Sequence, residues 1–400
     1  MCGIPVMCKC FNLIVLFLFT LNEEICCKVD PDVYRNITEI IRTKGYPCED
    51  YTVVTADGFI LSLQRIPNGV KGVKEGQTKA VVYIQHGLLC DSTMWVTNIV
   101  EDSLGFLLAD AGFDVWLGNS RGNTYSSRHV NLSPDDPKFW DWSWDEMAMY
   151  DIPAVVDFII NKTKQEQLYY IGHSQGTLIA FSAFSQNQNI AKKIKSFFAL
   201  APVAFLGHTK TKLRLLSDWP EWLYFDVFGK RDFLPSDWFF KFMAVTACND
   251  KWTVPICTNT LFVICGYDNQ NLNQSRLPVY IAHSPAGTSV KNMIHYSQAI
   301  STGKYQKYDY GTEGNRQHYG QDTPPQYNVC DMKTPVYLYS AGNDLLADPQ
   351  DVSQLIAQLQ TRYNSTEIPS WNHLDFAWGI DANRILYRQI IQILLNTERN

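Results

Sequence analysis

Five short, mostly apolar runs constrain the fold of this 400-residue chain more than any other feature. The first, residues 80–85, ends at His86-Gly87, and such a run is typical of a strand buried on both faces, as in parallel sheets. The other runs are residues 113–117, 168–171, 197–200 and 336–340. Helix-compatible segments alternate with these runs. The pattern therefore predicts an α/β fold with a mostly parallel sheet flanked by helices. Two alternating runs joined at Asp57-Gly58 predict a hairpin before it.

A long middle segment breaks this alternation. Residues from about 205 to 327 are rich in Trp, Tyr, Phe and Pro and have no regular order of strands and helices. We interpret them as one insertion after the run at 197–200. Because open α/β sheets bind ligands at the carboxyl ends of their strands, the insertion is expected to cover that edge.

The N-terminus has the pattern of a signal peptide. Lys9 precedes an apolar run at residues 11–21, which is too short to cross a bilayer comfortably. We assign residues 1–25 to the signal peptide, although no pair of small residues marks the cleavage site and an uncleaved anchor is the alternative. After cleavage we expect no integral membrane span.

Charge and cysteine spacing exclude several classes of partner. The net charge of −6 argues against nucleic acid, because phosphate binding needs a basic face. The cysteines beyond the leader lack the C-x-x-C spacing of zinc sites, so we expect no metal. Cys248 and Cys257 are close enough for one loop-closing disulfide. Five N-x-S/T sites are weak support for a secretory route: Asn36, Asn131, Asn161, Asn273 and Asn364.

The first chemical motif is Gly172-His-Ser-Gln-Gly176, between the run at 168–171 and a helix-compatible segment. A serine on a sharp strand-to-helix turn needs small neighbours so that the backbone can pass, and the two glycines meet that need. The helix N-terminus adds positive potential for a forming oxyanion. The motif predicts Ser174 as a nucleophile, with a structural serine in a glycine turn as the alternative.

A serine nucleophile needs a base and an orienting carboxylate, expected in the order Ser, acid, His. Of the five histidines after Ser174, only His373 lies beyond the last predicted strand. Asp344 follows the run at 336–340, where a triad acid belongs, and Asp348 is the runner-up, placed to cap the next helix. Two other aspartates fit less well, one too near the histidine and one before the strand: Asp375 and Asp331.

Two backbone donors are needed for the oxyanion of an acyl-transfer reaction. One is predicted at the N–H of Gln175, the residue after the nucleophile. The loop His86-Gly-Leu-Leu89 is placed to supply the second from Leu88. We assign no chemistry to His86.

Many segments together resemble the acid lipase family, which includes gastric, lingual and lysosomal acid lipases, with the lysosomal members most similar. They extend over nearly the whole chain after the leader: Asn36-Ile-Thr-Glu-Ile-Ile, Gly45-Tyr-Pro, Gln85-His-Gly-Leu-Leu, Ser103-Leu-Gly-Phe, Gly112-Phe-Asp-Val-Trp-Leu-Gly-Asn-Ser-Arg-Gly-Asn123, Gly172-His-Ser-Gln-Gly, His283-Ser-Pro-Ala-Gly-Thr-Ser289 and His373-Leu-Asp-Phe. The chain departs from the family at Ala341-Gly-Asn-Asp344, where relatives often have Gly-Gly-His-Asp, and in its Cys-rich leader.

The resemblance implies an α/β-hydrolase fold whose core is residues 26–204 and 330–400, with a cap domain at 205–329 that includes a movable lid. It implies Ser174, Asp344 and His373 as the triad, Leu88 and Gln175 as oxyanion donors, and a Cys248–Cys257 disulfide with Cys265 free. The aromatic residues of the insertion are expected to divide between cap core and an acyl-chain pocket with a lipid-seeking lid: Trp219, Trp222, Tyr224, Phe225, Phe228, Phe233, Trp238, Phe239 and Phe242.

The function expected from these residues is hydrolysis of triacylglycerols or cholesteryl esters through an acyl-enzyme, without a cofactor. We expect a secreted or lysosomal monomer that meets neutral lipid at a lipid–water interface. A peptidase or small-ester esterase on the same scaffold is one alternative, since a fold does not determine its substrate. An inactive lipid-binding relative is the other, and the complete triad argues against it. An acidic compartment follows from the resemblance alone.

Overall fold

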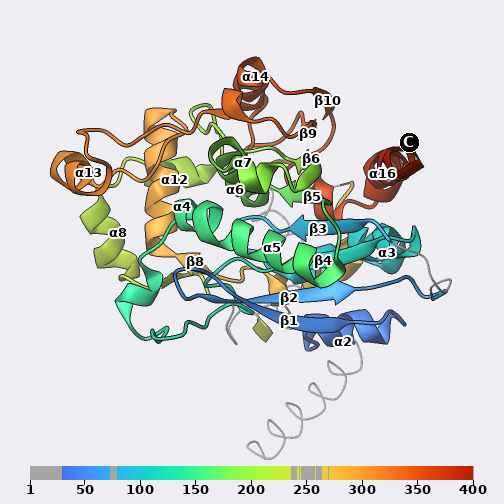
Figure 1. Ribbon diagram of the computed structural model, residues 1–400. Helices are drawn as coiled ribbons and strands as arrows, with labels where there is room; N and C mark the ends of the chain where they lie inside the picture. Colours follow the sequence, from blue (N-terminus) through green and yellow to red (C-terminus); the bar gives the residue numbers. More distant parts are fainter. Residues whose placement is uncertain are drawn as a thin grey trace, which may run out of the picture.

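The computed structural model describes residues 29–72, 79–235, 241, 242, 244, 257, 264–268 and 270–399, so the predicted signal peptide lies outside them. Within this part of the chain, eight strands form one sheet in the order β1-β2-β4-β3-β5-β6-β9-β10 (Figure 1). The strands are β1 (Glu49–Val54), β2 (Ile60–Ile66), β3 (Val81–Gln85), β4 (Asp114–Gly118), β5 (Leu168–His173), β6 (Ile194–Leu200), β9 (Val336–Ala341) and β10 (Tyr363–Ile368).

The sheet is mostly parallel. β1 and β2 form the predicted antiparallel hairpin, and β2 also runs antiparallel to β4. From β4 to β10 every neighbouring pair is parallel. Every residue of β3, β4 and β5 is buried, as the continuous apolar runs predict for strands covered on both faces. The predicted α/β class is therefore confirmed.

One strand of the sheet was not predicted. β10 has the sequence Tyr-Asn-Ser-Thr-Glu-Ile and pairs only with β9 at the edge of the sheet. Most of its side chains are exposed, so the strand carries no apolar run by which a sequence pattern could reveal it. The last strand before His373 is thus β10, and the prediction that β9 is the last strand was wrong.

Helices cover both faces of the sheet. The core helices are α2 (Ile37–Thr43), α3 (Leu104–Asp110), α4 (Trp144–Glu146), α5 (Ile152–Thr163), α6 (Gln175–Gln186), α7 (Gln188–Ala191), α14 (Pro349–Gln358), α15 (Asp375–Trp378) and α16 (Arg388–Arg399). In Figure 1, α4, α5 and α6 cross in front of the strands. α6 packs on β5, and eleven of its twelve residues are buried. The helix that begins at the nucleophile motif is thus held in the core.

The segment between β6 and β9, residues 201–335, is the predicted insertion; we call it the β6–β9 segment. In the described ranges its elements are η6 (Lys212–Leu216), α8 (Glu221–Phe228), β7 (Asp232–Phe233), η7 (Gln274–Arg276), α11 (Leu277–His283), β8 (Thr288–Ser289), α12 (Val290–Thr302), α13 (Gly311–Tyr319) and η8 (Val329–Asp331). Helices α8, α12 and α13 lie beyond the end toward which β3 and β5 point (Figure 1). These three helices therefore lie at the carboxyl ends of the strands, where the insertion was expected.

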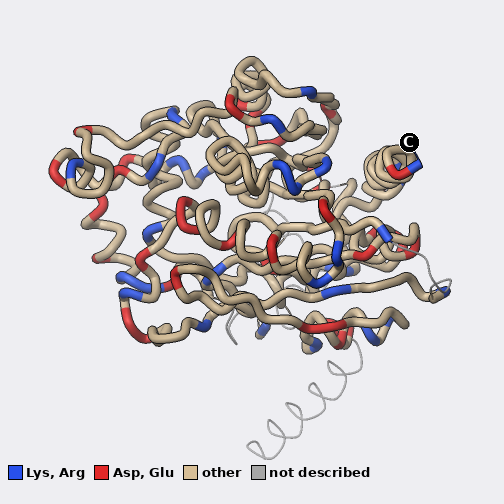
Figure 2. The backbone as a smooth tube through the Cα atoms, in the orientation of Figure 1, with Lys and Arg blue, Asp and Glu red and all other residues tan. Residues whose placement is uncertain are grey.

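Charges of both signs are mixed in the described part of the chain. Lys and Arg are interspersed with Asp and Glu along the whole trace (Figure 2), so no face shown there is basic enough for a phosphate backbone. None of the helices in the described ranges has the length and apolar character needed to cross a bilayer.

Candidate active site

Ser174 sits on a strained turn between β5 and α6. Its backbone has φ 53° and ψ −117°, a conformation that costs a non-glycine residue about 1–3 kcal/mol. A Cβ added to Gly172 would lie 2.7 Å from the carbonyl carbon of Gly176. A Cβ added to Gly176 would lie 2.5 Å from the carbonyl oxygen of Gln85. Both glycines are therefore required by close approach, and the sequence-based reading of the motif as a sharp turn agrees with the geometry.

His373, in the loop after β10, is paired with a carboxylate in the loop after β9. Its Nδ1 lies 2.8 Å from Oδ2 of Asp344, and both residues are buried. The other oxygen of Asp344 accepts hydrogen bonds from the N–H groups of Leu346 and Ala347, each at 2.8 Å. Backbone donors and the imidazole thus fix the carboxylate in place, as an orienting acid requires.

The loop that carries His373 is bound to the nucleophile turn through the backbone. Nε2 of His173 donates to the carbonyl oxygen of His373 at 2.9 Å, and the two rings are 4.8 Å apart between centroids. Ser174 Oγ and the His373 ring share no hydrogen bond in this structure, and the sequence prediction that they meet directly stays a prediction. In enzymes without substrate such bonds are often long and tighten in the Michaelis complex.

The alternative acids have other tasks. Asp348 is the N-cap of α14, accepting from Gln350 N–H at 2.9 Å, and also lies 2.7 Å from Nζ of Lys210. Asp375 accepts from Asn372 N–H at 2.6 Å within the histidine loop. Asp331 precedes β9, at the opposite end of that strand from Asp344. Geometry therefore favours Asp344.

A second His–Asp pair lies outside this site. Nδ1 of His208 is 2.8 Å from Oδ1 of Asp351, but the His208 side chain is 51% exposed. The three other histidines after Ser174 have partners of their own: His283 with the carbonyl oxygen of Asp32, His295 with Ser143 and the carbonyl oxygen of Gln306, and His318 stacked on Tyr310. Chain order alone separated His373 from His208, and the structure adds burial to that distinction.

The two predicted oxyanion donors lie next to the serine turn. Gln175 is the first residue of α6, and a Cβ on Gly87, which precedes Leu88, would lie 3.1 Å from the Cβ of Ser174. In the described part of the chain, neither the Leu88 N–H nor the Gln175 N–H donates a hydrogen bond to protein. Two unpaired backbone donors beside a serine are what an oxyanion hole requires.

The β6–β9 segment contacts these loops through groups that the sequence did not reveal. The carbonyl oxygen of Cys265 accepts from the N–H of His373 at 3.2 Å and from that of Leu345 at 3.5 Å, so it links the histidine and acid loops. Gly266, with φ 110°, would bring a Cβ within 2.0 Å of Asn343 O. Asn292 donates from Nδ2 to the Gln175 side chain at 2.8 Å. Backbone carbonyl contacts leave no residue-type signal, so no sequence pattern could have found the first of these.

Some aromatic residues of this segment are buried and others are exposed. Tyr224 and Phe233 are buried in a cluster with Trp219, Phe225 and Phe228 at its edge, and Leu88 and Leu89 pack against the same cluster. Trp222 is 63% exposed and Phe242 54% exposed. Trp238 and Phe239 lie outside the described residues.

Most of the remaining predicted sites, the cysteines and the glycosylation asparagines, lie within the described residues. Cys257 is disulfide-bonded and Cys265 is a free thiol, whereas Cys248 lies outside the described residues. Of the five N-x-S/T asparagines, four are exposed and Asn273 is half-buried. No group of three or more His, Cys, Asp or Glu residues in the described ranges is placed to hold a metal ion.

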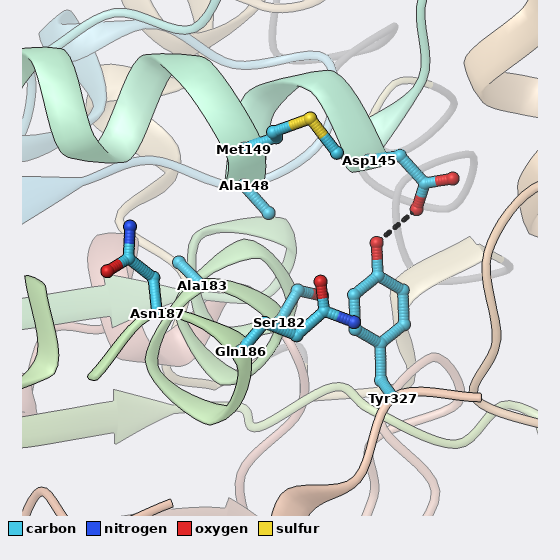
Figure 3. A pocket seen from close by; sticks show the side chains of 8 residues that line it. All are labelled: Asp145, Ala148, Met149, Ser182, Ala183, Gln186, Asn187 and Tyr327. Carbon is cyan, nitrogen blue, oxygen red and sulfur yellow. Dashed lines mark hydrogen bonds between the residues drawn. The ribbon is translucent and has the colours of Figure 1, made fainter. Parts of the chain in front are cut away.

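The described residues also enclose a cavity of about 180 Å³ (Figure 3). It is lined by Asp145, Ala148, Met149, Ser182, Ala183, Gln186, Asn187 and Tyr327. The hydroxyl of Tyr327 donates to the carboxylate of Asp145, which burial keeps at a raised pKa of about 6. The cavity is smaller than the roughly 300–1,000 Å³ of most ligand pockets and contains none of the triad residues.

Comparison with known proteins identifies the family of this chain. Residues 80–380 match the model of the alpha/beta hydrolase fold family, and residues 37–99 match a partial alpha/beta-hydrolase lipase region. The chain is 50% identical to human gastric triacylglycerol lipase, with 91% of this chain and 92% of that protein covered. It is 49% identical to human lysosomal acid lipase/cholesteryl ester hydrolase, with 95% and 97% covered.

Similarity of fold extends to distant structures. A protein of known structure from Sulfolobus solfataricus has a TM-score of 0.55 at 17% identity, covering 87% of this chain and 99% of that one. At that identity the likeness concerns the fold alone. The similarity to gastric and lysosomal lipases is much higher and extends over almost the entire chain. The identities of 50% and 49% are too close to show which of the two this chain resembles more. The chain therefore belongs to the α/β-hydrolase fold family and, within it, to the acid lipases.

Proposed function

We propose that this protein hydrolyses the carboxylic ester bonds of neutral lipids, triacylglycerols or cholesteryl esters, through a serine acyl-enzyme. The observation that carries the proposal is the buried pair of His373 and Asp344 at 2.8 Å, with the histidine loop hydrogen-bonded to His173 beside Ser174. Membership of a family whose relatives are named for these two activities supports the choice of substrate.

The proposed steps follow from the positions of the groups. Ser174 Oγ attacks the ester carbonyl while Nε2 of His373 takes its proton, and Asp344 keeps the other ring proton on Nδ1. The N–H groups of Leu88 and Gln175 donate to the tetrahedral oxyanion. Nε2 then protonates the leaving alcohol, and a water activated by the same nitrogen releases the fatty acid. No cofactor enters these steps.

The β6–β9 segment supplies the cap in this proposal, with residues 205–329 as cap domain and a lid within it. Trp222 and Val227 of α8 are exposed while Tyr224 on the same helix is buried, so the helix presents two large apolar side chains to solvent. Exposed apolar surface of this kind is costly in water and favourable at a lipid boundary. We propose a monomer of the secretory pathway, secreted or lysosomal, that meets its substrate at such a boundary.

Labelling with a fluorophosphonate tests the chemistry. The wild-type protein should be labelled at one site and release fatty acid from emulsified triolein and cholesteryl oleate, whereas Ser174→Ala should do neither. His373→Ala should lose at least ~10³-fold in kcat, as expected for a triad base.

The control is His208→Ala, which removes the other His–Asp pair and should leave kcat unchanged within twofold. Equal losses in the two histidine variants, or undiminished labelling of Ser174→Ala, would contradict the assignment.

A further inference from the structure

A buried histidine at the end of β3 has no part in the proposed catalytic steps. His86 is 1% exposed and precedes Gly87 and Leu88, the loop that supplies one proposed oxyanion donor. A backbone donor is useful to an oxyanion only if its peptide is held in one orientation. A role for His86 in holding that peptide therefore rests on the proposed function.

The protonation state of His86 is determined by its neighbours. The backbone N–H of Ser120 donates to Nε2 at 3.0 Å, and the Asn123 side-chain amide lies 3.2 Å from the same nitrogen. A backbone N–H can only donate, so Nε2 must carry a lone pair. Burial lowers the pKa of His86 to about 4, which keeps the ring neutral at milder acidity. The one ring proton is therefore on Nδ1.

That proton is directed at the oxyanion loop. Nδ1 of His86 lies 2.8 Å from the carbonyl oxygen of Gly87, which also accepts from the N–H of Cys90 at 3.3 Å. The Gly87–Leu88 peptide bond is trans, and in a trans peptide the C=O and the following N–H point in opposite directions. Holding the carbonyl on the His86 side therefore turns the Leu88 N–H to the other side, where it has no partner within the described chain.

The peptide needs such a restraint because glycine permits rotation here. A flip of the Gly87–Leu88 plane changes ψ of Gly87 and φ of Leu88, and glycine resists that rotation least of all residues. A flipped peptide would present a carbonyl oxygen where an oxyanion donor is required.

The loop after β4, whose Ser120 N–H donates to His86 Nε2, is itself held by ion pairs. Between Ser120 and Asn123 lies Arg121, which is 1% exposed and forms ion pairs at 2.6 Å with both Asp57 and Asp151. This fixes the Ser120 N–H and, through it, the tautomer of His86.

We propose that His86 is a positioning residue: its Nδ1–H, held in that tautomer by the loop after β4, fixes the Gly87–Leu88 peptide so that Leu88 N–H faces the oxyanion. This role is separate from those of the proposed triad and of the proposed cap.

Two substitutions separate positioning from packing. His86→Asn places an amide nitrogen near the position of Nδ1 and can still donate to Gly87, whereas His86→Leu fills the space without a donor. On a soluble short-chain ester, His86→Leu should lower kcat by about 10–100-fold, below the roughly 10²–10³-fold effect of deleting an oxyanion donor outright. KM should change less than threefold, and His86→Asn should recover most of kcat.

A second readout is affinity for a trifluoromethyl ketone, whose adduct with serine carries an oxyanion. It should weaken in His86→Leu by the same factor as kcat. If His86→Leu does not fold, His86→Gln replaces it. The amide of glutamine reaches the position of Nε2 rather than that of Nδ1, so the kcat of His86→Gln should be lowered by the same factor.

The outcomes distinguish the two proposals. Equal deficits in His86→Asn and His86→Leu, or unchanged kcat in both, would overturn the positioning role while fluorophosphonate titration of Ser174 still reached one equivalent. A wild-type protein that is neither labelled nor active would overturn the proposed function together with this inference.

Discussion

Replacing Asp344 by asparagine tests the central pair most directly. The carboxylate accepts three hydrogen bonds, from His373 Nδ1, Leu346 N–H and Ala347 N–H, each at 2.8 Å. The amide oxygen of the substituted side chain would keep the two backbone donors, so the loop should hold its shape. The amide nitrogen would then face Nδ1 and stabilise the tautomer with its proton on Nε2, which cannot take the proton of Ser174.

The magnitude follows from that tautomer. A triad with the wrong imidazole tautomer loses about 10⁴ in kcat, which is about 5.5 kcal/mol of transition-state stabilisation at about 1.36 kcal/mol per tenfold. The assay is kcat on a soluble ester, with thermal unfolding to check that the fold is retained.

The matched control is Asp348→Asn, the runner-up acid. Asparagine is as good an N-cap as aspartate, so α14 should be retained and kcat should stay within about twofold. A tenfold or smaller loss in Asp344→Asn, or a comparable loss in Asp348→Asn, would refute the assignment of the acid.

Three further predictions concern the turn, the histidine loop and the lipid surface. Gly176→Ala should lower kcat by about 10²-fold and reduce Tm, because the new Cβ would lie 2.5 Å from Gln85 O and must displace the serine turn; unaltered kinetics would show that the turn has room. Burial, together with the nearby Asp268 and Asp381, raises the pKa of Asp375 to about 8, so the folded protein holds this proton more tightly than the unfolded chain. The stability it contributes is complete below pH 3.8 and is lost as the pH rises to about 8. The Tm of Asp375→Asn relative to wild type should therefore increase from pH 4 to pH 8, and a flat difference would contradict this. Trp222→Ser should weaken binding to triolein emulsions several-fold without changing hydrolysis of a soluble ester, since Trp222 is 63% exposed; loss on both substrates would indicate a role in the cap core.

Residue patterns were sufficient to predict those features whose physical requirement involves only neighbouring residues in the chain. A strand covered on both faces must be apolar throughout, and this is why the runs at β3, β5 and β9 could be recognised. A sharp turn between a strand and a helix needs glycines on both sides of the serine, because an added Cβ would lie 2.7 Å from a backbone atom at Gly172 and 2.5 Å from one at Gly176. Chain order then separated His373 from four other histidines.

Where the requirement was not local, the patterns failed. β10 is polar because it lies at the edge of the sheet, and pairing with β9 rather than burial holds it there. The carbonyl oxygen of Cys265 links the acid and histidine loops, yet every residue type carries a carbonyl.

The sequence by itself thus determined the fold class and singled out candidate residues for the site, because strand burial and turn geometry select residue types. Tertiary structure alone decided which groups meet and how they are oriented: the carboxylate behind His373, the exposure of His208, and the peptide that His86 holds. Those relations depend on distances between segments remote in the chain and on the directions of backbone donors, and neither is encoded in the residue types themselves.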